Sequence, residues 1–120
     1  MSKIKIDIQR AYDAPAEEVE SFRVLVDRLW PRGIKKENLE LDFWAKDISP
    51  SSELRKAYHK HPDDFMTFKK NYLKELETNS NLDSFMDELK KHKKIVLLYA
   101  SKEREKNNAM VLKEFLDKKI

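Results

Sequence analysis

The chain has 120 residues, no cysteine, and a formal net charge of +3 from 25 basic and 22 acidic residues. This length predicts one domain, residues 1–120, with a hydrophobic core of its own. The absence of cysteine excludes disulfides, a thiol nucleophile and a thiolate metal site. The longest apolar run, IVLLYA at 95–100, is too short to cross a bilayer, and the opening MSKIKIDIQR lacks a signal-peptide core. We therefore expect a soluble cytoplasmic protein with no membrane partner.

Acidic and basic residues are interleaved along the chain, which is typical of a solvated surface. Charged residues make up 39% of the sequence, yet the only block of one sign is KKHKK at 90–94, so we do not expect nucleic-acid binding. The arginines are distributed unevenly, because five of the six lie in the first half of the chain: Arg10, Arg23, Arg28, Arg32 and Arg55. Arginine suits bidentate recognition of carboxylate or phosphate, so this half is expected to recognise anions.

The first two predicted elements are strands. KIKIDIQ at 3–9 alternates isoleucine with polar residues, which predicts a strand with one covered face. FRVLVDRL at 22–29 is a nearly continuous apolar run, which predicts a strand buried on both faces, as in the centre of a parallel sheet.

Helical signals fill the middle of the chain. SPSSELRKAYHKH begins with Ser49 as the candidate N-cap and Pro50 at the first helical position. The next helix is predicted to open at HPDDF, with Pro62 at its start and two aspartates that complement the helix dipole. A third helix, NLDSFMDELKKH, is predicted to begin at Asn81.

A buried strand and a helix complete the chain. KIVLLYA at 94–100 resembles the run at 22–29, and we expect these two strands to be adjacent or nearly so. A last helix is predicted at about residues 105–118. This order predicts an α/β fold, a three-layer sandwich with a small, mainly parallel sheet flanked by helices. Ligands of such sheets bind beyond the carboxyl ends of the strands, so the segments after Val26 and Leu98 are where a site is expected.

Polar residues gather in three segments that this rule selects. The first is the end of the second strand, with Asp27, Arg28, Trp30 and Arg32 before the single glycine. The second is FWAKDISPSSELR at 43–55, where a serine-rich helix start and an arginine would attract an anion. The third is YASKEREKNNA at 99–109.

These segments resemble one protein family. RVLVDRLWPRG, WAKDISPSSELRKAYHKHP and LLYASKEREKNNAMVL, with QRAYDAP near the start, are similar to the YeaO-like proteins of the domain-of-unknown-function 488 (DUF488) family. The resemblance covers nearly the whole chain and implies a small bacterial α/β protein with no settled activity. It also implies a shared polar site at Asp27, Arg28, Trp30, Arg32, Trp44, Asp47, Ser51, Arg55, Tyr99 and Asn107. Relatives typically carry histidine where this chain has Asn108; if that histidine were the catalytic base, this member would be impaired or would use another group.

Several of these residues also have a structural interpretation. An ion pair at a strand end is the alternative for Asp27 with Arg28. Core or wall positions are the alternative for Trp30 and Trp44, and capping is the alternative for the serines at 49–52. HKHPDD suggests a metal site through His59, His61, Asp63 and Asp64. Histidines two residues apart on a helix point away from each other, so we expect no metal and no other cofactor.

The leading hypothesis is a pocket for an anionic small molecule, such as a nucleotide or sugar phosphate. We expect Arg28, Arg32 and Arg55 to converge around it, beside the helix that starts near Ser51. Asp27 or Asp47 would be the acid or base of an enzyme of the glycosyl-transfer or hydrolase type, and the sequence leaves open whether the protein is an enzyme. The alternative is a non-catalytic binding or regulatory protein that engages a protein or nucleic-acid partner. The sequence predicts no particular oligomeric state.

Overall fold

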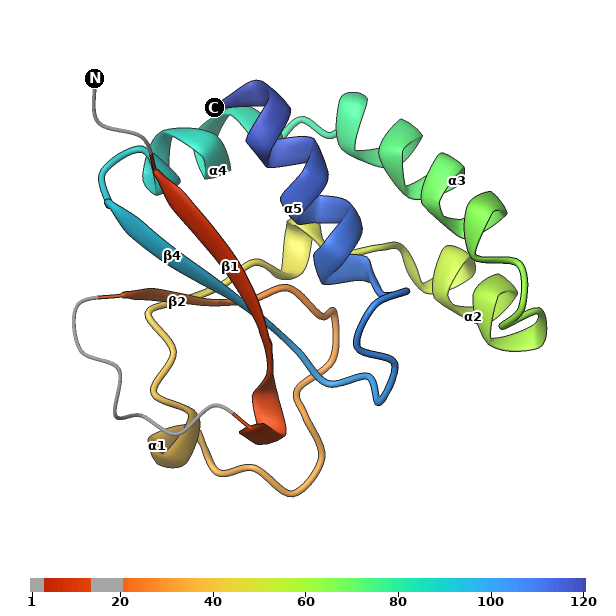
Figure 1. The fold of residues 1–120 in the computed structure, drawn as a ribbon, viewed down its shortest axis with the longest axis horizontal. Coiled ribbons are helices and arrows are strands. Elements are labelled where there is room, and N and C mark those ends of the chain that lie inside the picture. The colour runs from red at the N-terminus through yellow and green to blue at the C-terminus, as the bar shows by residue number, and fades with distance from the viewer. Residues whose placement is uncertain (1–3, 14–20) are drawn as a thin grey trace.

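The computed structural model describes residues 4–13 and 21–120 and shows a parallel β-sheet flanked by helices (Figure 1). Within these residues the sheet has four strands in the order β1-β4-β2-β3. Their bounds are Lys5–Arg10 for β1, Phe22–Leu25 for β2, Phe43–Trp44 for β3 and Lys94–Tyr99 for β4. Every pairing is parallel, and β2 lies directly beside β4. The predicted α/β class, the parallel sheet and the adjacency of these two strands are therefore confirmed.

The position of β4 between β1 and β2 explains its continuous apolar sequence. Ile95 and Leu97 pack into the large core cluster on one face of the sheet, and Val96 and Leu98 pack into a smaller cluster on the other. The second predicted strand is shorter than expected, because β2 ends at Leu25. The chain still follows β4 for one more residue, since the amide of Val26 donates to the carbonyl of Leu98 at 3.0 Å. These two strands therefore end side by side at the carboxyl edge of the sheet.

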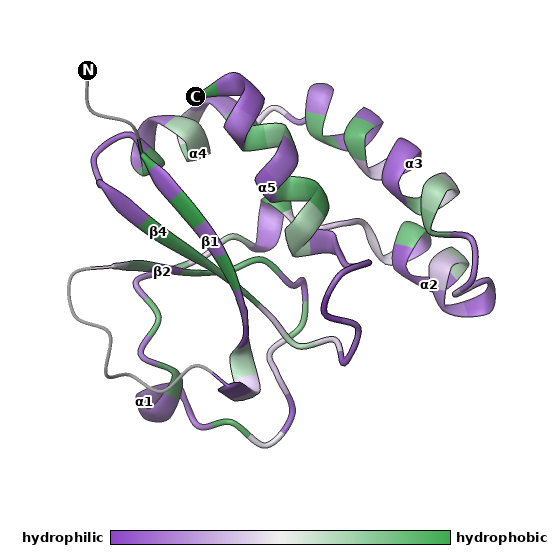
Figure 2. Ribbon diagram, in the orientation of Figure 1, coloured by the Kyte–Doolittle hydropathy of each residue, from purple (hydrophilic) through white to green (hydrophobic). Residues whose placement is uncertain are grey.

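Four helices contribute to the large core cluster on one side of the sheet: α2 (Ser52–Lys60), α3 (Phe65–Glu77), α4 (Leu82–Leu89) and α5 (Asn108–Lys119). β4 is apolar along most of its length, whereas β1 and each of these helices carry both apolar and polar residues (Figure 2). This pattern fits helices that bury one stripe and expose the other. None of the helices among the described residues is long and apolar enough to span a membrane.

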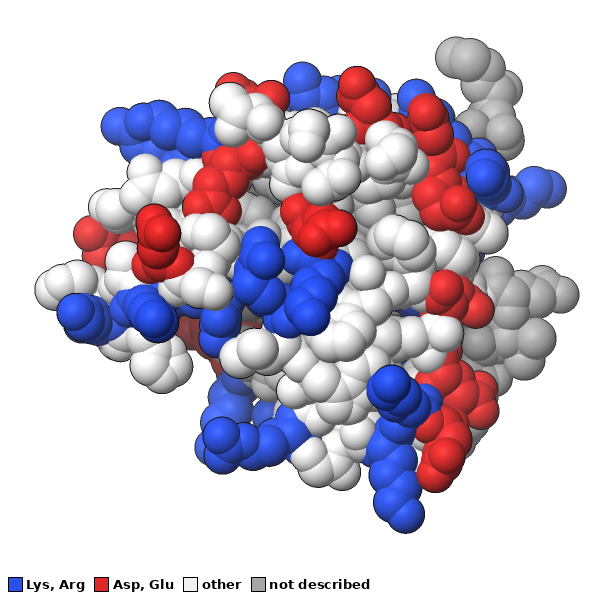
Figure 3. All heavy atoms as spheres, turned by 180° about the vertical axis from the view of Figure 1, so that it is seen from behind, with Lys and Arg blue, Asp and Glu red and all other residues white. Residues whose placement is uncertain are grey.

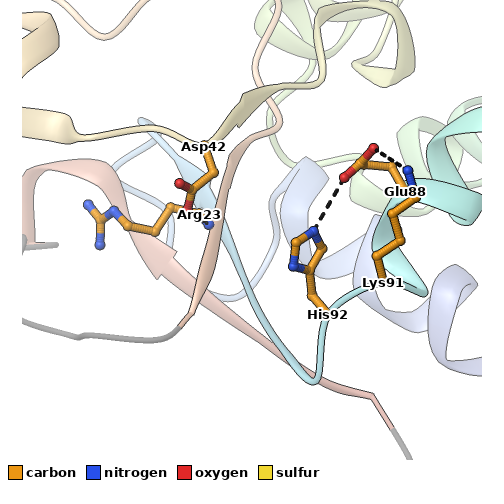
Figure 4. A network of polar contacts seen from close by, with 5 residues as sticks. All are labelled: Arg23, Asp42, Glu88, Lys91 and His92. Atoms are coloured by element: carbon orange, nitrogen blue, oxygen red, sulfur yellow. Dashed lines mark hydrogen bonds and ion pairs between the residues drawn. The ribbon is translucent and has the colours of Figure 1, made fainter.

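The other side of the sheet is covered by the four-residue helix α1 (Lys36–Leu39) and the segments around it. Arg23 holds this layer in place from β2, where its side chain is only 5% exposed. Its Nε and one terminal nitrogen donate to the carbonyl of Leu39 at 3.1 and 2.7 Å, and Nε also donates to the carbonyl of Glu40 at 3.2 Å. The backbone amide of Arg23 donates to the Asp42 carboxylate at 2.8 Å (Figure 4). One arginine of the first half is therefore an internal anchor.

Two helix starts differ from the prediction. Ser51, not Ser49, is the N-cap of α2, and its Oγ accepts from the amide of Leu54 at 3.2 Å. Ser49 is buried, and its hydroxyl donates to the carbonyl of Ala45 at 2.8 Å. Pro62 likewise does not start α3, because the N-cap is Asp64. Each helix starts after the residue whose side-chain oxygen accepts from the amide three residues later. The prolines do not mark the starts.

Other boundaries shift by a few residues. The last helix begins at Asn108 rather than near residue 105, and the helix predicted from Asn81 runs from Leu82. Lys3 of the first predicted strand and the last two residues of the QRAYDAP segment lie outside the described residues. On the face opposite to that of Figure 1, basic and acidic side chains are interspersed among uncharged ones (Figure 3). This face has the mixed charge expected from the interleaved sequence.

Candidate functional site

Asp27 lies just beyond the end of β2, where three segments of the chain meet. One oxygen of its carboxylate accepts a hydrogen bond of 2.8 Å from the amide of Ala100, which follows β4. The other oxygen accepts a hydrogen bond of 3.0 Å from the Nδ2 group of Asn108, the first residue of α5. Asp27 therefore ties the ends of two central strands to the start of a helix, at the edge of the sheet where a site was expected.

The amide of Asn108 has a fixed orientation in this arrangement. Its Nδ2 group donates to the carbonyl of Val26 at 2.7 Å as well as to Asp27. Both hydrogens of the group are thus directed at acceptors, and the side chain presents Asp27 with a donor. Burial raises the pKa of the Asp27 carboxyl above its ordinary value, and this effect outweighs the hydrogen bonds from Asn108 and Ala100 and the charge of Arg55.

Arg28 and Arg55 have different surroundings. Arg28 donates through Nε to the carbonyl of Pro50 at 3.1 Å and through a terminal nitrogen to the carbonyl of Ser49 at 3.2 Å. These bonds fix its guanidinium against the turn before α2. Arg55, on α2, is half-buried, and no described residue hydrogen-bonds its guanidinium. Its positive charge still acts on Asp27, because it favours the ionised carboxylate.

The predicted anion position at the start of α2 is filled by a carboxylate of the protein itself. Glu75 of α3 accepts from the backbone amide of Ser51 at 3.0 Å and from its hydroxyl at 2.6 Å. A negative charge at a helix N-terminus is favourable for the same reasons that an external anion would be. Ser51 is therefore both the cap of α2 and the partner of an internal acid.

The two predicted tryptophans lie on the α1 side of the sheet. The indole of Trp30 donates to the carbonyl of Ile34 at 2.6 Å, and that of Trp44 donates to the backbone carbonyl of Asp27 at 2.7 Å. Their rings meet edge to face, with centroids 5.5 Å apart, and both are half-buried against the smaller core cluster. Arg32 lies in the same loop with an exposed side chain, and its backbone carbonyl accepts from Tyr12 at 2.7 Å. No contact within the described residues joins Arg32 to Arg28 or Arg55.

The remaining predicted residues have other surroundings. Tyr99 is 3% exposed and belongs to the large core cluster. Asn107 is the N-cap of α5, where its Oδ1 accepts from the amide of Met110 at 2.8 Å. Asp47 is exposed in the short 3-10 helix η2 (Lys46–Ile48), and its backbone carbonyl accepts from Asn79 at 2.7 Å. The structure therefore places Asp27, Arg55 and Asn108 near one another, and Asp47 in a separate segment.

Two residues near this site were not predicted from the sequence. They are Glu75 and Tyr72 of α3. Tyr72 is fully buried, its hydroxyl donates to the carbonyl of Ile48 at 2.8 Å, and burial together with the charges of Asp27 and Glu75 raises its pKa. The available signal was their spacing of three residues, which places the acid beside the apolar stripe of α3.

No metal site is visible in the described part of the chain, because it contains no group of three or more His, Asp or Glu side chains that could hold an ion. His59, His61, Asp63 and Asp64 are all exposed around the turn between α2 and α3.

Residues 5–120 match a family model described as the inactive DUF488-N3 subclade. The chain belongs to this family. It is 45% identical over 113 residues to the uncharacterized protein YeaO of Escherichia coli strain K12, which covers 94% of this chain and 97% of that protein. It is also 38% identical over 78 residues to the uncharacterized protein Rv3073c of Mycobacterium tuberculosis, or 65% of each chain. No solved structure matches significantly. The resemblance to YeaO-like proteins is thus confirmed.

Proposed function

We propose that this protein is a non-catalytic binding protein for a small anionic molecule, held at the Asp27 site, which comprises Asp27, Arg28, Arg55 and Asn108. The observation that carries the proposal is the guanidinium of Arg55. It is half-buried, it acts on the charge of Asp27, and no described residue hydrogen-bonds it. A partly desolvated arginine gains more from a phosphate or carboxylate than an exposed one, because charges interact more strongly away from water.

The identity of residue 108 supports binding without catalysis. Its side chain is the direct partner of Asp27, at 3.0 Å. A histidine there would form an aspartate–histidine pair able to take up and release a proton. An asparagine amide has no such titration, and here both of its hydrogens are already donated. The family description, an inactive subclade, agrees with this interpretation. An enzyme of the glycosyl-transfer or hydrolase type is therefore less well supported than a binding protein.

The ligand class we propose is a nucleotide or a sugar phosphate, in the cytoplasm. Arg55 would contact its anionic group, and Arg28, fixed by two backbone carbonyls, would add positive charge without moving. The carboxylate of Asp27 keeps lone pairs beyond those it uses for Ala100 and Asn108, and these would accept from a ligand hydroxyl.

A thermal-shift series tests the proposal. Nucleoside monophosphates and hexose phosphates would be titrated against the wild-type protein, Arg55→Gln, and the control Lys56→Gln, which removes the same charge from an exposed neighbour. A ligand at about 100 times its Kd should stabilise the wild type by about 2.7 kcal/mol. We expect Arg55→Gln to lose this shift and Lys56→Gln to keep it. Equal losses in both variants, or no shift with any ligand, would contradict the proposal.

Two further measurements separate the alternatives. Mass spectrometry of the stabilising ligands after incubation should show no product, and turnover would overturn the non-catalytic assignment. Binding to an oligonucleotide that weakens steeply with added salt would instead support a nucleic-acid partner, because counterion release dominates such complexes.

A further inference from the structure

A hollow lies between β3, η2 and α4, apart from the residues of the Asp27 site. It has a volume of about 290 Å³, and its lining residues include the aromatic Phe43, Trp44 and Phe85 and the acidic Asp47 and Glu88. We call it the α4 groove. We infer that the α4 groove binds a compact organic cation, an amine whose apolar body packs against the rings while its charge meets the two carboxylates.

The aromatic wall is suited to a cation with an apolar body. The ring of Phe43 is 37% exposed, and its centroid lies 5.9 Å from that of Phe85 and 6.4 Å from that of Phe22. Its position is thus fixed by rings around it. The ring of Trp44 packs against Trp30 and the smaller core cluster, so the rings that a ligand would contact here are those of Phe43 and Phe85. An ammonium group within about 6 Å of a ring centroid forms a cation–π contact, and a ligand amine would form one with these rings.

The charge of the lining favours the same class of ligand. The residues that form the α4 groove include two acids and no lysine or arginine. The carboxylate of Asp47 is exposed and accepts no hydrogen bond from a described residue. Glu88 accepts from Lys91 at 3.4 Å and from His92 at 3.3 Å (Figure 4). These contacts are long, and the side chain of Lys91 is 68% exposed, so a ligand ammonium could compete for the same oxygens.

The size of the groove limits the ligand. Pockets for drug-sized ligands span about 300 to 1,000 Å³, so this volume suits a molecule at the small end of that range. A nucleotide or sugar phosphate would also bring negative charge to two acids. The ligand of the α4 groove is therefore chemically opposite to the anion proposed for the Asp27 site, and the two inferences stand independently.

Three probes of similar shape and different charge test the inference: 2-phenylethylamine, neutral 2-phenylethanol and anionic 3-phenylpropionate. Isothermal titration gives their affinities, and amide chemical shifts in NMR locate them. We expect the amine to bind at least about fivefold more tightly than the alcohol, as one cation–π contact or ion pair would provide, and the acid to bind most weakly. Shift changes should centre on Phe43, Trp44 and the residues of α4.

The variants assign the effect to the two acids. Asp47→Asn with Glu88→Gln should bring the affinity of the amine down to that of the alcohol. Asp83→Asn is the matched control, because Asp83 is exposed on the same helix and does not line the groove. Arg55→Gln should leave amine binding unchanged, whatever its effect on anions. Equal binding of amine and alcohol, equal losses in the double variant and the control, or shift changes elsewhere on the protein would overturn the inference.

Discussion

The substitution Asp27→Asn should destabilise the protein, because it places two hydrogen-bond donors opposite each other. If the new amide oxygen accepts from Ala100, its Nδ2 group faces the Nδ2 group of Asn108. Asn108 has no means of adapting, because turning its amide would point its oxygen at the carbonyl of Val26. A protonated aspartic acid would avoid this conflict, since it keeps two oxygens at the same positions.

The magnitude follows from the contacts that are lost. A hydrogen bond to a charged acceptor contributes about 1.5–3 kcal/mol, and a buried donor without a partner costs about 1–3 kcal/mol. Removing a partly buried charge relieves some of this cost, because burial disfavours the ionised Asp27. We therefore expect a net loss of about 2 kcal/mol at neutral pH, which corresponds to a fall in Tm on the order of 8 °C for a domain of this size.

Urea unfolding of a double-mutant cycle with Asn108→Ala measures the coupling between the two side chains, which includes the wild-type hydrogen bond and the donor conflict. Alanine removes the opposing donor, so Asp27→Asn should cost less in that background, with a coupling free energy of about 1 kcal/mol. The Val26 carbonyl loses its donor in both proteins that carry Asn108→Ala, so this loss cancels when those two proteins are compared. If the two substitutions add to within about 0.3 kcal/mol, the donor conflict does not exist and the reasoning fails.

The difference in stability between the wild type and Asp27→Asn should show an unusual pH dependence. The pKa of Asp27 in the folded protein is raised above the ordinary value of 3.8. Its contribution to stability is therefore complete below that ordinary value and is lost as pH rises through the folded pKa. The advantage of the wild type over Asp27→Asn should be larger at about pH 3.5 than at about pH 7. An advantage that grows with pH would mean that the hydrogen bonds to the carboxylate outweigh its burial.

Two other predictions concern internal polar contacts. Arg23→Met should cost about 2–3 kcal/mol, because buried carbonyls, including that of Leu39, lose a charged donor, whereas the exposed control Lys36→Met should stay within about 0.5 kcal/mol. Ser51→Ala should cost about 2 kcal/mol, because it removes a helix cap and one of the hydrogen bonds of an internal carboxylate, while Ser52→Ala at the adjacent exposed position should have little effect. Urea unfolding measures both pairs, and equal losses within either pair would contradict the prediction for that pair.

The sequence predicted the strands that are buried on both faces and missed the elements that depend on their neighbours. β2 and β4 were predicted because a continuous apolar run indicates a buried strand whatever its neighbours are. β3 has only two residues and exists because β2 offers it an edge. The layer around α1 is held by Arg23, a charged residue within a strand. A pattern of apolar residues does not predict the contacts of a charged side chain.

The place of the candidate site was predictable, but its internal contacts were not. The rule on the carboxyl ends of parallel strands selected the segments that contain Asp27 and Ala100. Their hydrogen bond joins residues 73 positions apart, and the bond between Asp27 and Asn108 joins residues 81 positions apart. Glu75 of α3 contacts Ser51 at the start of α2, although an acid on an amphipathic helix is normally predicted to lie on the surface. Only the packing of the helices brings such partners together.

The charged side chains that follow β2 are thus largely engaged in hydrogen bonds within the protein. Asp27 joins two strands to α5, and Arg28 holds the turn before α2, so neither side chain has to be ordered when a ligand arrives. Side chains that are fixed in advance lower the entropic cost of binding. Burial raises the pKa of Asp27, but Asn108 presents it with a donor and offers no group to which a proton could be passed on. Arg55 is the one charged side chain of this site that donates no hydrogen bond to a described residue. A rigid frame around a guanidinium that no described residue hydrogen-bonds is an arrangement that favours holding an anion over transforming it.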